Sequence, residues 1–251
     1  MYLKKNILII GCGNIGFRHV QSLIKNNNIN KIYIYDIDFC SYDIVRSKLK
    51  TYKNKINFIY NFNKIKIKNF FLVIFSNYAK GRYLSFKLID QKFKVQYYLI
   101  EKIVENNLSA IEKFKKNKKI KFVNLPMRMM RPFKLINKIF SGQVIDCVYH
   151  GTKWNLLSNS LHYINFVSHI TQSKIEEINI VKIGKPYKTK RPGQVDFFGK
   201  IFVKYSNGST LFLNSVEKKI TRKFDLINKN NSFRYYLDQN ILKFNKKKLI
   251  I

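Results

Sequence analysis

The sequence predicts two domains, an α/β domain over residues 1–125 with a doubly wound parallel sheet and an α+β domain over residues 126–251. In the first half, short apolar runs alternate with longer amphipathic ones, as in β-α-β units. After about residue 125 this alternation gives way to helices followed by long strand-like segments. Hydrophobic residues make up 46% of the 251 residues, which is enough apolar material for buried cores.

The elements of the first half follow from local patterns. Six apolar, β-branched runs predict strands: Asn6–Ile10, Lys31–Asp36, Ile56–Tyr60, Phe70–Ser76, Val95–Glu101 and Lys119–Asn124. Apolar residues at helical spacing predict helices between them: Ile15–Lys25, Gly81–Gln91 and Ser109–Asn117. Ser109 and Glu112 have the spacing of a capping box, so we expect the third helix to begin there.

The second half mixes helices and strands. The patterns predict helices near Pro132–Phe140 and Asn159–Thr171, with a strand-like segment over Gln143–Gly151. Asn207-Gly208 separates two apolar runs, and Asn-Gly in that setting is the strongest short hairpin signal. We therefore expect an antiparallel sheet in this half.

The formal net charge is +34, from 48 Lys and Arg against 14 Asp and Glu. Lys, Asn, Ile, Phe and Tyr, all residues of AT-rich codons, make up 140 of the 251 residues, so base composition explains much of this charge. The lysines are scattered along the sequence, and their densest runs, Lys113–Lys121 and Lys246–Lys248, are not interleaved with aromatic residues as a single-strand binding platform would be. We expect no specific nucleic-acid partner. A polyanion-binding protein remains an alternative, which affinity for duplex DNA as a function of salt would distinguish.

Cysteine and histidine spacing argues against structural metal or disulfides. Cys12, Cys40 and Cys147 are odd in number and far apart, and the four histidines show no paired spacing with carboxylates. No apolar run approaches the roughly 18 residues of a membrane span. The first residues lead straight into a strand-like run without a leader pattern. We expect no metal, no membrane partner and a cytoplasmic location.

A G-x-G-x-x-G run at Gly11–Gly16 directly follows the first strand and opens the first helix. Gly11 permits the tight turn, Gly13 lets the backbone approach a pyrophosphate and Gly16 allows close helix–strand packing, with Asn14 and Ile15 at the helix start. Together these features predict a Rossmann-type, dinucleotide-binding domain.

Asp36 ends the second strand, where this fingerprint places an acidic residue. Its carboxylate would accept hydrogen bonds from ribose hydroxyls and repel a 2′-phosphate, which favours NAD over NADP. A methyltransferase on a Rossmann-like sheet is a further alternative, distinguished by binding of S-adenosylmethionine.

Two more strands end in polar residues at the same, ligand-facing edge of a doubly wound sheet. Ser76 ends the fourth strand and is a candidate for cofactor contact. Glu101 and Lys102 close the fifth strand, so an acid and a base lie above the same crevice.

Together these motifs resemble the Gfo/Idh/MocA family, named for glucose-fructose oxidoreductase and inositol dehydrogenase. The resemblance spans most of the chain and rests on the opening Gly-Cys-Gly-Asn-Ile-Gly-Phe-Arg-His, on Asp36, on Glu101-Lys102-Ile103 in the place of an E-K-P motif, and on Asn159-Ser160-Leu161-His162. Four further segments, 124–129, 151–154, 197–199 and 206–209, together with 159–162, look like a branch associated with bacterial surface-glycan gene clusters.

The resemblance implies a Rossmann domain followed by a substrate-binding and oligomerisation domain with an open, mostly antiparallel sheet, here shortened. It implies hydride transfer between a nicotinamide cofactor and a hydroxyl-bearing carbon of a sugar or nucleotide sugar, in a dimer or tetramer formed through that sheet. Lys102 and His162 would be catalytic, and which one accepts the proton stays open. Glu101 would contact the cofactor. The implied substrate contacts are Asn124, Arg128, Trp154 and Asn159.

Three features depart from the family pattern. Ile103 replaces the usual Pro of E-K-P, and Asn165 stands where an H-x-x-D motif has Asp. The second domain is short for this family, so we expect a more open pocket. Loss of the Asp carboxylate leaves a second hypothesis, a family member that binds NAD or a sugar nucleotide without turnover.

Overall fold

The computed structural model describes residues 4–189, 194–245 and 247–249. Contacts between Cα atoms divide the chain into two compact units, residues 1–124 (unit 1) and 125–251 (unit 2). Each unit has its own sheet and its own apolar core.

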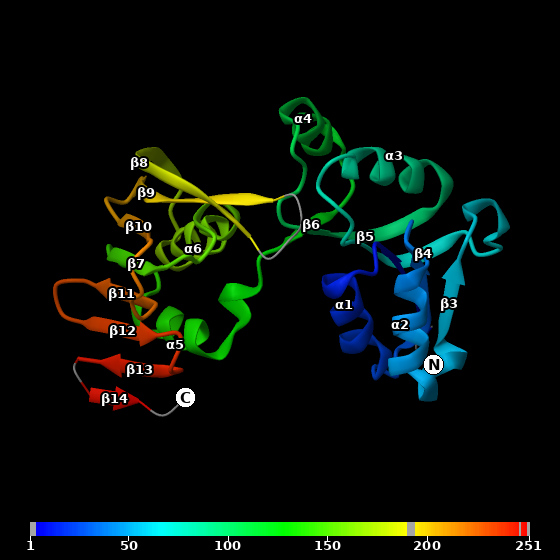
Figure 1. Cartoon of the computed structure of the whole chain (residues 1–251), viewed down its shortest axis with the longest axis horizontal. Coiled ribbons are helices and arrows are strands. Elements are labelled where there is room, and N and C mark those ends of the chain that lie inside the picture. Colours follow the sequence, from blue (N-terminus) through cyan, green and yellow to red (C-terminus); the bar gives the residue numbers. More distant parts are fainter. Residues whose placement is uncertain (1–3, 190–193, 246, 250–251) are drawn as a thin grey trace. The chain divides into compact units, whose positions relative to one another are not determined.

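Unit 1, the blue to green part of Figure 1, contains a parallel sheet (sheet A) of six strands. The strand order is β3-β2-β1-β4-β5-β6. The strands are β1 (Lys5–Ile10), β2 (Ile29–Tyr35), β3 (Ile56–Ile59), β4 (Asn69–Phe75), β5 (Lys94–Glu101) and β6 (Lys121–Asn124). The helices are α1 (Asn14–Ile24), α2 (Cys40–Lys48), α3 (Arg82–Lys92) and α4 (Leu108–Lys116), with short 3-10 turns η1 (Lys50–Lys55) and η2 (Phe62–Lys64). The chain order places the switch in winding direction between β1 and β4, so the expected doubly wound fold is confirmed.

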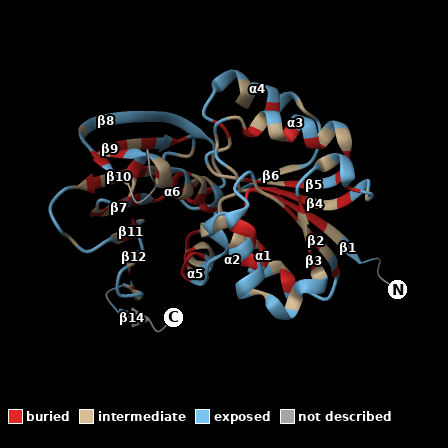
Figure 2. Ribbon diagram, turned by 45° about the vertical axis from the view of Figure 1, so that its right-hand side comes forward, coloured by how far each residue is buried: buried red, intermediate tan, exposed pale blue. Residues whose placement is uncertain are grey.

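Helices cover both faces of this sheet (Figure 2). Val20 of α1 and Val45 of α2 belong to the core on one face, and Phe86 of α3 and Phe114 of α4 belong to the core on the other. The central strand β1 is consequently apolar and buried from Ile7 to Ile10, and these residues contribute to both cores. This is why the strand reads as a continuous apolar run in the sequence.

The start of α4 differs from the expectation. Asn107 is the N-cap, and its side-chain oxygen accepts a hydrogen bond of 3.1 Å from the backbone N–H of Ala110. Ser109 therefore lies inside the helix, and the capping box predicted from Ser109 and Glu112 is wrong. Asparagine caps a helix as well as serine does, and the earlier of the two signals is the one used.

Unit 2 is a mostly antiparallel sheet (sheet B) in the order β14-β13-β12-β11-β7-β10-β9-β8. Its strands are β7 (Asp146–Thr152), β8 (Ile175–Lys188), β9 (Val195–Tyr205), β10 (Thr210–Val216), β11 (Lys223–Ile227), β12 (Ser232–Tyr236), β13 (Ile241–Phe244) and β14 (Lys247–Leu249). Its helical segments are η3 (Pro126–Met129), α5 (Arg131–Phe140) and α6 (Leu156–Thr171). Both helices contribute to a core on one face of the sheet, and alternation along β7, with Cys147 and Tyr149 buried and Val148 exposed, leaves the other face open.

The expected hairpin is confirmed, since β9 and β10 pair antiparallel around Asn207-Gly208 and Gly208 has a φ of +87°. One pairing was not expected: β7 and β10 are parallel neighbours although most of the sheet is antiparallel. Helix α6 begins at Leu156, three residues before the expected start. Its first turn is capped from a distant strand, because the Asp196 carboxylate accepts from the backbone N–H groups of Leu157 and Ser158 at 3.0 and 3.3 Å.

Candidate functional site

The turn after β1 needs glycine at two positions because other backbone lies against it. Gly11 has a φ of +88°, and a Cβ there would lie 2.4 Å from the backbone nitrogen of Asn77. A Cβ on Gly16 would lie 2.0 Å from the carbonyl oxygen of Gly11. Both contacts are shorter than any real Cβ tolerates, so these glycines let α1 begin close against the end of the sheet.

Gly13 has a different environment. It is the N-cap of α1, it is exposed, and a Cβ there would meet nothing within 4 Å. The first backbone N–H groups of a helix have no partner within the helix, and the first turn of α1 carries no acidic residue. Open space beside unpaired N–H groups at a helix N-terminus suits a phosphate group.

Asp36 lies beside this turn. Its carboxylate accepts hydrogen bonds from the backbone N–H of Cys12 and, at 2.9 Å, from that of Asp38. The buried Tyr42 hydroxyl fixes the strand end, accepting from the Asp36 N–H at 3.0 Å and donating to the Ile59 carbonyl at 2.7 Å. A carboxylate has about four lone-pair sites, so Asp36 keeps acceptor capacity for two ligand hydroxyls.

The end of β4 supports the same turn. The Ser76 hydroxyl donates to the Gly11 carbonyl at 2.6 Å, which commits its proton to holding the turn. Asn77 follows, and its buried side-chain oxygen has no hydrogen-bond partner among the residues that the structure describes. A buried acceptor without a partner costs free energy unless a ligand or water fills the role.

Glu101 ends β5 and is held by two neighbours. Nε2 of His19, on α1, lies 2.8 Å from the Glu101 Oε1, and the Asn124 side-chain amide donates to the same oxygen at 2.5 Å. Burial raises the pKa of Glu101, but the hydrogen bonds from His19 and Asn124, together with the electrostatic attraction of His19 and Arg82, outweigh it, so the pKa lies below its ordinary value. Glu101 is therefore an oriented, ionised carboxylate at the ligand-facing edge.

Sequence reasoning missed two residues at this edge, Arg82 and Glu105, both only 3% exposed. The Arg82 guanidinium donates to the carbonyl oxygens of Asn77, Glu101 and Ile103, which joins the loop after β4 to the loop after β5. Burial lowers the pKa of Arg82 to about 10, against the opposing effect of Glu101 and Glu105.

The Glu105 carboxylate caps α3 by accepting from the backbone N–H groups of Gly81 and Tyr83 at 3.2 and 3.0 Å. Arg82 and Glu105 thus fix the segment that carries Lys102, which is itself half-buried. A rare acid and a rare arginine in a lysine-rich chain were the only sequence signal for this arrangement.

In unit 2, α6 carries the residues expected to act on a substrate. Asn159, His162 and Asn165 are spaced three residues apart and are half-buried, whereas Tyr163, Phe166 and Val167 belong to the core. The Asn159 side-chain amide donates to the Trp154 carbonyl at 2.8 Å, which fixes the start of the helix. The polar face of α6 therefore presents amide and imidazole groups.

Trp154 has a different place from the one expected. Its side chain is 5% exposed, its indole N–H donates to the Asn214 carbonyl at 3.0 Å, and the rings of Tyr149 and Tyr163 pack against it. It belongs to the core of unit 2 and offers no ring face to a sugar. Arg128 is exposed on η3.

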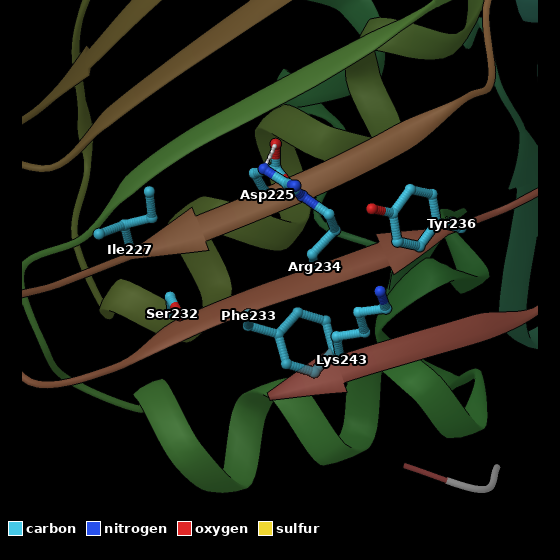
Figure 3. Close-up of a pocket in the computed structure, with 7 residues that line it drawn as sticks. All are labelled: Asp225, Ile227, Ser232, Phe233, Arg234, Tyr236 and Lys243. Carbon is cyan, nitrogen blue, oxygen red and sulfur yellow. Dashed lines mark hydrogen bonds and ion pairs between the residues drawn. The ribbon is translucent and has the colours of Figure 1, made fainter. Parts of the chain in front are cut away.

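Two cavities lie away from these residues. One of about 280 Å³ lies on the open face of sheet B, over β11, β12 and β13, where Arg234 pairs with Asp225 (Figure 3). The other, of about 510 Å³, lies beside β3 in unit 1. No predicted site residue lines either cavity.

Across the described ranges, no group of three or more His, Cys, Asp or Glu could hold a metal ion. Within the same ranges, every helix is too short or too polar to cross a bilayer.

The chain is 27% identical over 265 aligned residues to an uncharacterised protein of Plasmodium falciparum (isolate 3D7). The alignment covers 96% of this chain but only 16% of that protein, so the chain spans about one sixth of its relative's length. No known family model matches the chain.

Solved dehydrogenase structures have the same fold at low sequence identity. UDP-N-acetylglucosamine 3-dehydrogenase GnnA from Acidithiobacillus ferrooxidans aligns with a TM-score of 0.73 and 11% identity, over 98% of this chain and 82% of that chain. A proposed NADPH-dependent oxidoreductase from Desulfitobacterium hafniense aligns with a TM-score of 0.72 and 12% identity, over 100% of this chain and 83% of that chain. GenD2 from gentamicin A biosynthesis, in complex with NAD, aligns with a TM-score of 0.71 and 9% identity, over 93% of this chain and 72% of that chain.

These alignments include both sheets and confirm the expected fold class, a parallel Rossmann-type sheet followed by a mostly antiparallel one. The chain therefore has the fold of the Gfo/Idh/MocA-type dehydrogenases.

Proposed function

We propose that the chain is an NAD-dependent oxidoreductase that transfers a hydride between nicotinamide and a hydroxyl-bearing carbon of a sugar or nucleotide sugar. Unit 1 would be its dinucleotide-binding domain and unit 2 its substrate-binding and oligomerisation domain. The observation that carries the proposal is the open space at Gly13, beside the α1 N-terminus and the Asp36 carboxylate. The fold of the three dehydrogenases supports it.

The cofactor would be bound at the carboxyl ends of β1, β2, β4 and β5. The backbone from Gly11 to Gly16, including Asn14 and Ile15, would bind the pyrophosphate, and Asp36 would accept from the adenosine ribose. The Asp36 carboxylate disfavours a second negative charge at the ribose, which favours NAD over NADP. Glu101 and the oxygen of Ser76 would accept from the remaining hydroxyl or amide groups.

Lys102 and His162 are the proposed proton-handling residues. The cofactor, when bound, supplies the hydride acceptor or donor. An ammonium group stabilises a developing alkoxide, and an imidazole exchanges a proton near neutral pH. Asn159 and Arg128, with Asn124 through Glu101, would orient sugar hydroxyls.

The test is the reduction of NAD, followed by absorbance, with a panel of sugars and nucleotide sugars that includes UDP-N-acetylglucosamine. Lys102→Ala and His162→Ala should each lower turnover by about a hundredfold or more while NAD binding persists. Leu161→Ala, one residue from His162 and exposed, is the matched control and should keep the wild-type rate. A variant of Lys102 or His162 that keeps the wild-type rate would remove that residue from the mechanism.

A second candidate is a protein that binds NAD or a sugar nucleotide without turnover, which Asn165 favours because an amide cannot share a proton with His162 as a carboxylate can. Asn165→Asp distinguishes the two. A gain of turnover in that variant, over an inactive wild type that still binds NAD, would establish the binding-only protein.

We also propose a dimer or tetramer formed through the open face of sheet B, a role in surface-polysaccharide or carbohydrate metabolism, and a cytoplasmic location. The open face carries partly exposed apolar residues such as Val148 beside paired charges such as Asp225 and Arg234, a mixture common in interfaces. Light scattering of the purified protein gives its mass directly, and a monomer at micromolar concentration would contradict the assembly.

A further inference from the structure

The strands of sheet A begin among lysines. Six segments lie where these strands begin, and they include the last residues of the preceding helices and the first residues of the strands: 4–5, 25–31, 48–55, 64–68, 92–94 and 116–121. They hold 31 residues, of which 17 are lysine and none is acidic. Because the strands are parallel, their starting ends form one edge of the sheet, which we call the amino edge. The fold therefore gathers lysines that are scattered along the sequence.

The opposite edge of the same sheet serves as an internal control. The segments that follow the strands there, residues 11–13, 36–39, 60–61, 76–81 and 102–107, hold 21 residues with two lysines and three acids. AT-rich codons raise the lysine content of a chain without regard to position. Composition thus explains how many lysines the chain has, but it does not explain their concentration at one edge.

Hydrogen bonds join several neighbouring segments of the amino edge. On one side, the Lys31 ammonium donates to the Asn54 carbonyl, and that of Lys55 donates to the carbonyls at the end of α1. In the middle, the Lys5 N–H donates to Asn28, and the Lys94 N–H donates to the Lys68 carbonyl at 2.8 Å.

On the β5 and β6 side of the amino edge, hydrogen bonds and an ion pair likewise join neighbouring segments. Lys92 donates to Asn63, and Asn117 and Lys119 both lie against Asp90 of α3. The Asp90 carboxylate also accepts from the Tyr98 hydroxyl at 2.6 Å, so this acid is already engaged.

Some of these lysines have a structural role, because a cation near a helix C-terminus stabilises the last carbonyls. Lys55 and Lys121 are of this kind. Lys64, Lys66 and Lys68 are not: all three are exposed in the loop between β3 and β4, and none makes an ion pair within residues 4–189, 194–245 and 247–249. Their charges repel one another unless an anion lies between them.

We propose that the amino edge of unit 1 binds the phosphate backbone of nucleic acid without regard to sequence. Six strands about 4.8 Å apart span about 24 Å, a length over which duplex DNA presents about 14 negative charges. Asn26, Asn27 and Asn28 lie between Lys25 and Lys31 and add amide donors for phosphate and sugar oxygens. Of the large apolar side chains in these six segments, Ile120 alone is exposed, so the edge lacks the apolar groups that insert into a membrane.

This proposal goes beyond the oxidoreductase, since the amino edge and the cofactor edge are opposite ends of one sheet. It leaves the expectation of no specific nucleic-acid partner intact, because lysines that meet phosphates carry no information about bases.

The test compares two triple variants that remove equal charge. Lys64→Gln, Lys66→Gln and Lys68→Gln act at the amino edge, and Lys218→Gln, Lys219→Gln and Lys229→Gln remove three exposed lysines of unit 2. Binding of a labelled duplex of random sequence is followed by fluorescence anisotropy from low to physiological salt. Wild type should bind with a dissociation constant of about 10⁻⁴ to 10⁻⁶ M at physiological salt.

The amino-edge variant should lower the slope of log affinity against log salt by about three, one for each lysine that no longer meets a phosphate. The unit 2 variant and saturating NAD should both leave the slope unchanged. If the slope fell equally in the two variants, the affinity would depend on net charge alone, and the proposal would be overturned. The proposal would also be overturned if, at physiological salt, the protein bound vesicles rich in anionic lipid but did not bind the duplex.

Discussion

Gly13 and Gly16 lie in one turn, but a side chain would have a different effect at each position. At Gly16 a side chain collides with the Gly11 carbonyl, whereas at Gly13 it enters empty space. We expect Gly16→Ala to destabilise unit 1 by about 1–3 kcal/mol, the range for forcing a methyl into packed structure. Gly13→Ala should melt like wild type but bind NAD at least about tenfold more weakly, equivalent to about 1.4 kcal/mol.

Thermal denaturation and calorimetric titration on the same two proteins separate these effects. Wild-type affinity for NAD in a well-folded Gly13→Ala protein would show that the open space at Gly13 does not receive the cofactor.

We expect Glu101 to make the free energy of unfolding depend on pH in the acidic range. Its pKa in the folded chain lies below the ordinary value of 4.5. The carboxylate therefore contributes stability above that value, and the contribution is lost as the pH falls through the lower, folded pKa. Wild type should lose more stability between about pH 6 and about pH 3 than Glu101→Gln does.

Denaturant titrations at each pH measure this difference. Glu112→Gln is the control, because the pair of Glu112 with Lys115 is exposed and screened by solvent. Parallel pH profiles for wild type and Glu101→Gln would contradict the assignment of His19 and Asn124 as partners that stabilise the carboxylate.

Which residue types gather at the ligand-facing edge was predictable, but how each side chain is used was not. Gly11, Asp36 and Glu101 follow from strand ends and a motif. Whether Ser76 faces a ligand or the Gly11 carbonyl, and whether Trp154 lies in a core or at a surface, depends on long-range packing that a local pattern does not encode.

Helix α4 provides a direct test of its observed start. Asn107→Ala should destabilise unit 1 by about 1 kcal/mol, because it removes the acceptor for the Ala110 N–H. Ser109→Ala should change stability by less than about 0.5 kcal/mol, since the cap hydrogen bond is accepted by Asn107 and not by the Ser109 hydroxyl. Chemical denaturation of the two variants checks this, and a larger loss in Ser109→Ala would restore the capping box.

Elements buried on both faces or bounded by a strong turn were the predictable ones. The run over Asn6–Ile10 and the turn at Asn207-Gly208 each determine a local conformation. The parallel contact of β7 with β10 was not predictable, because about 60 residues separate the partners and neither strand carries a signal for the other.

The whole chain keeps a dehydrogenase fold at 9–12% identity to the three solved dehydrogenases. Its composition is far from average, yet none of the described lysines or asparagines is buried, and isoleucine and phenylalanine supply many of the core residues. The pattern of burial, together with a few glycines and acids, is therefore what specifies this fold.

The central claim is that unit 1 binds NAD at the Gly11–Gly16 turn. Calorimetric titration with NAD, NADH, NADP and NADPH, at physiological salt to screen the +34 charge, tests it most directly. We expect saturable binding with a preference for the pair without the 2′-phosphate, lost in Gly13→Ala. Binding of none of the four would contradict the oxidoreductase and leave a dehydrogenase fold that serves another purpose.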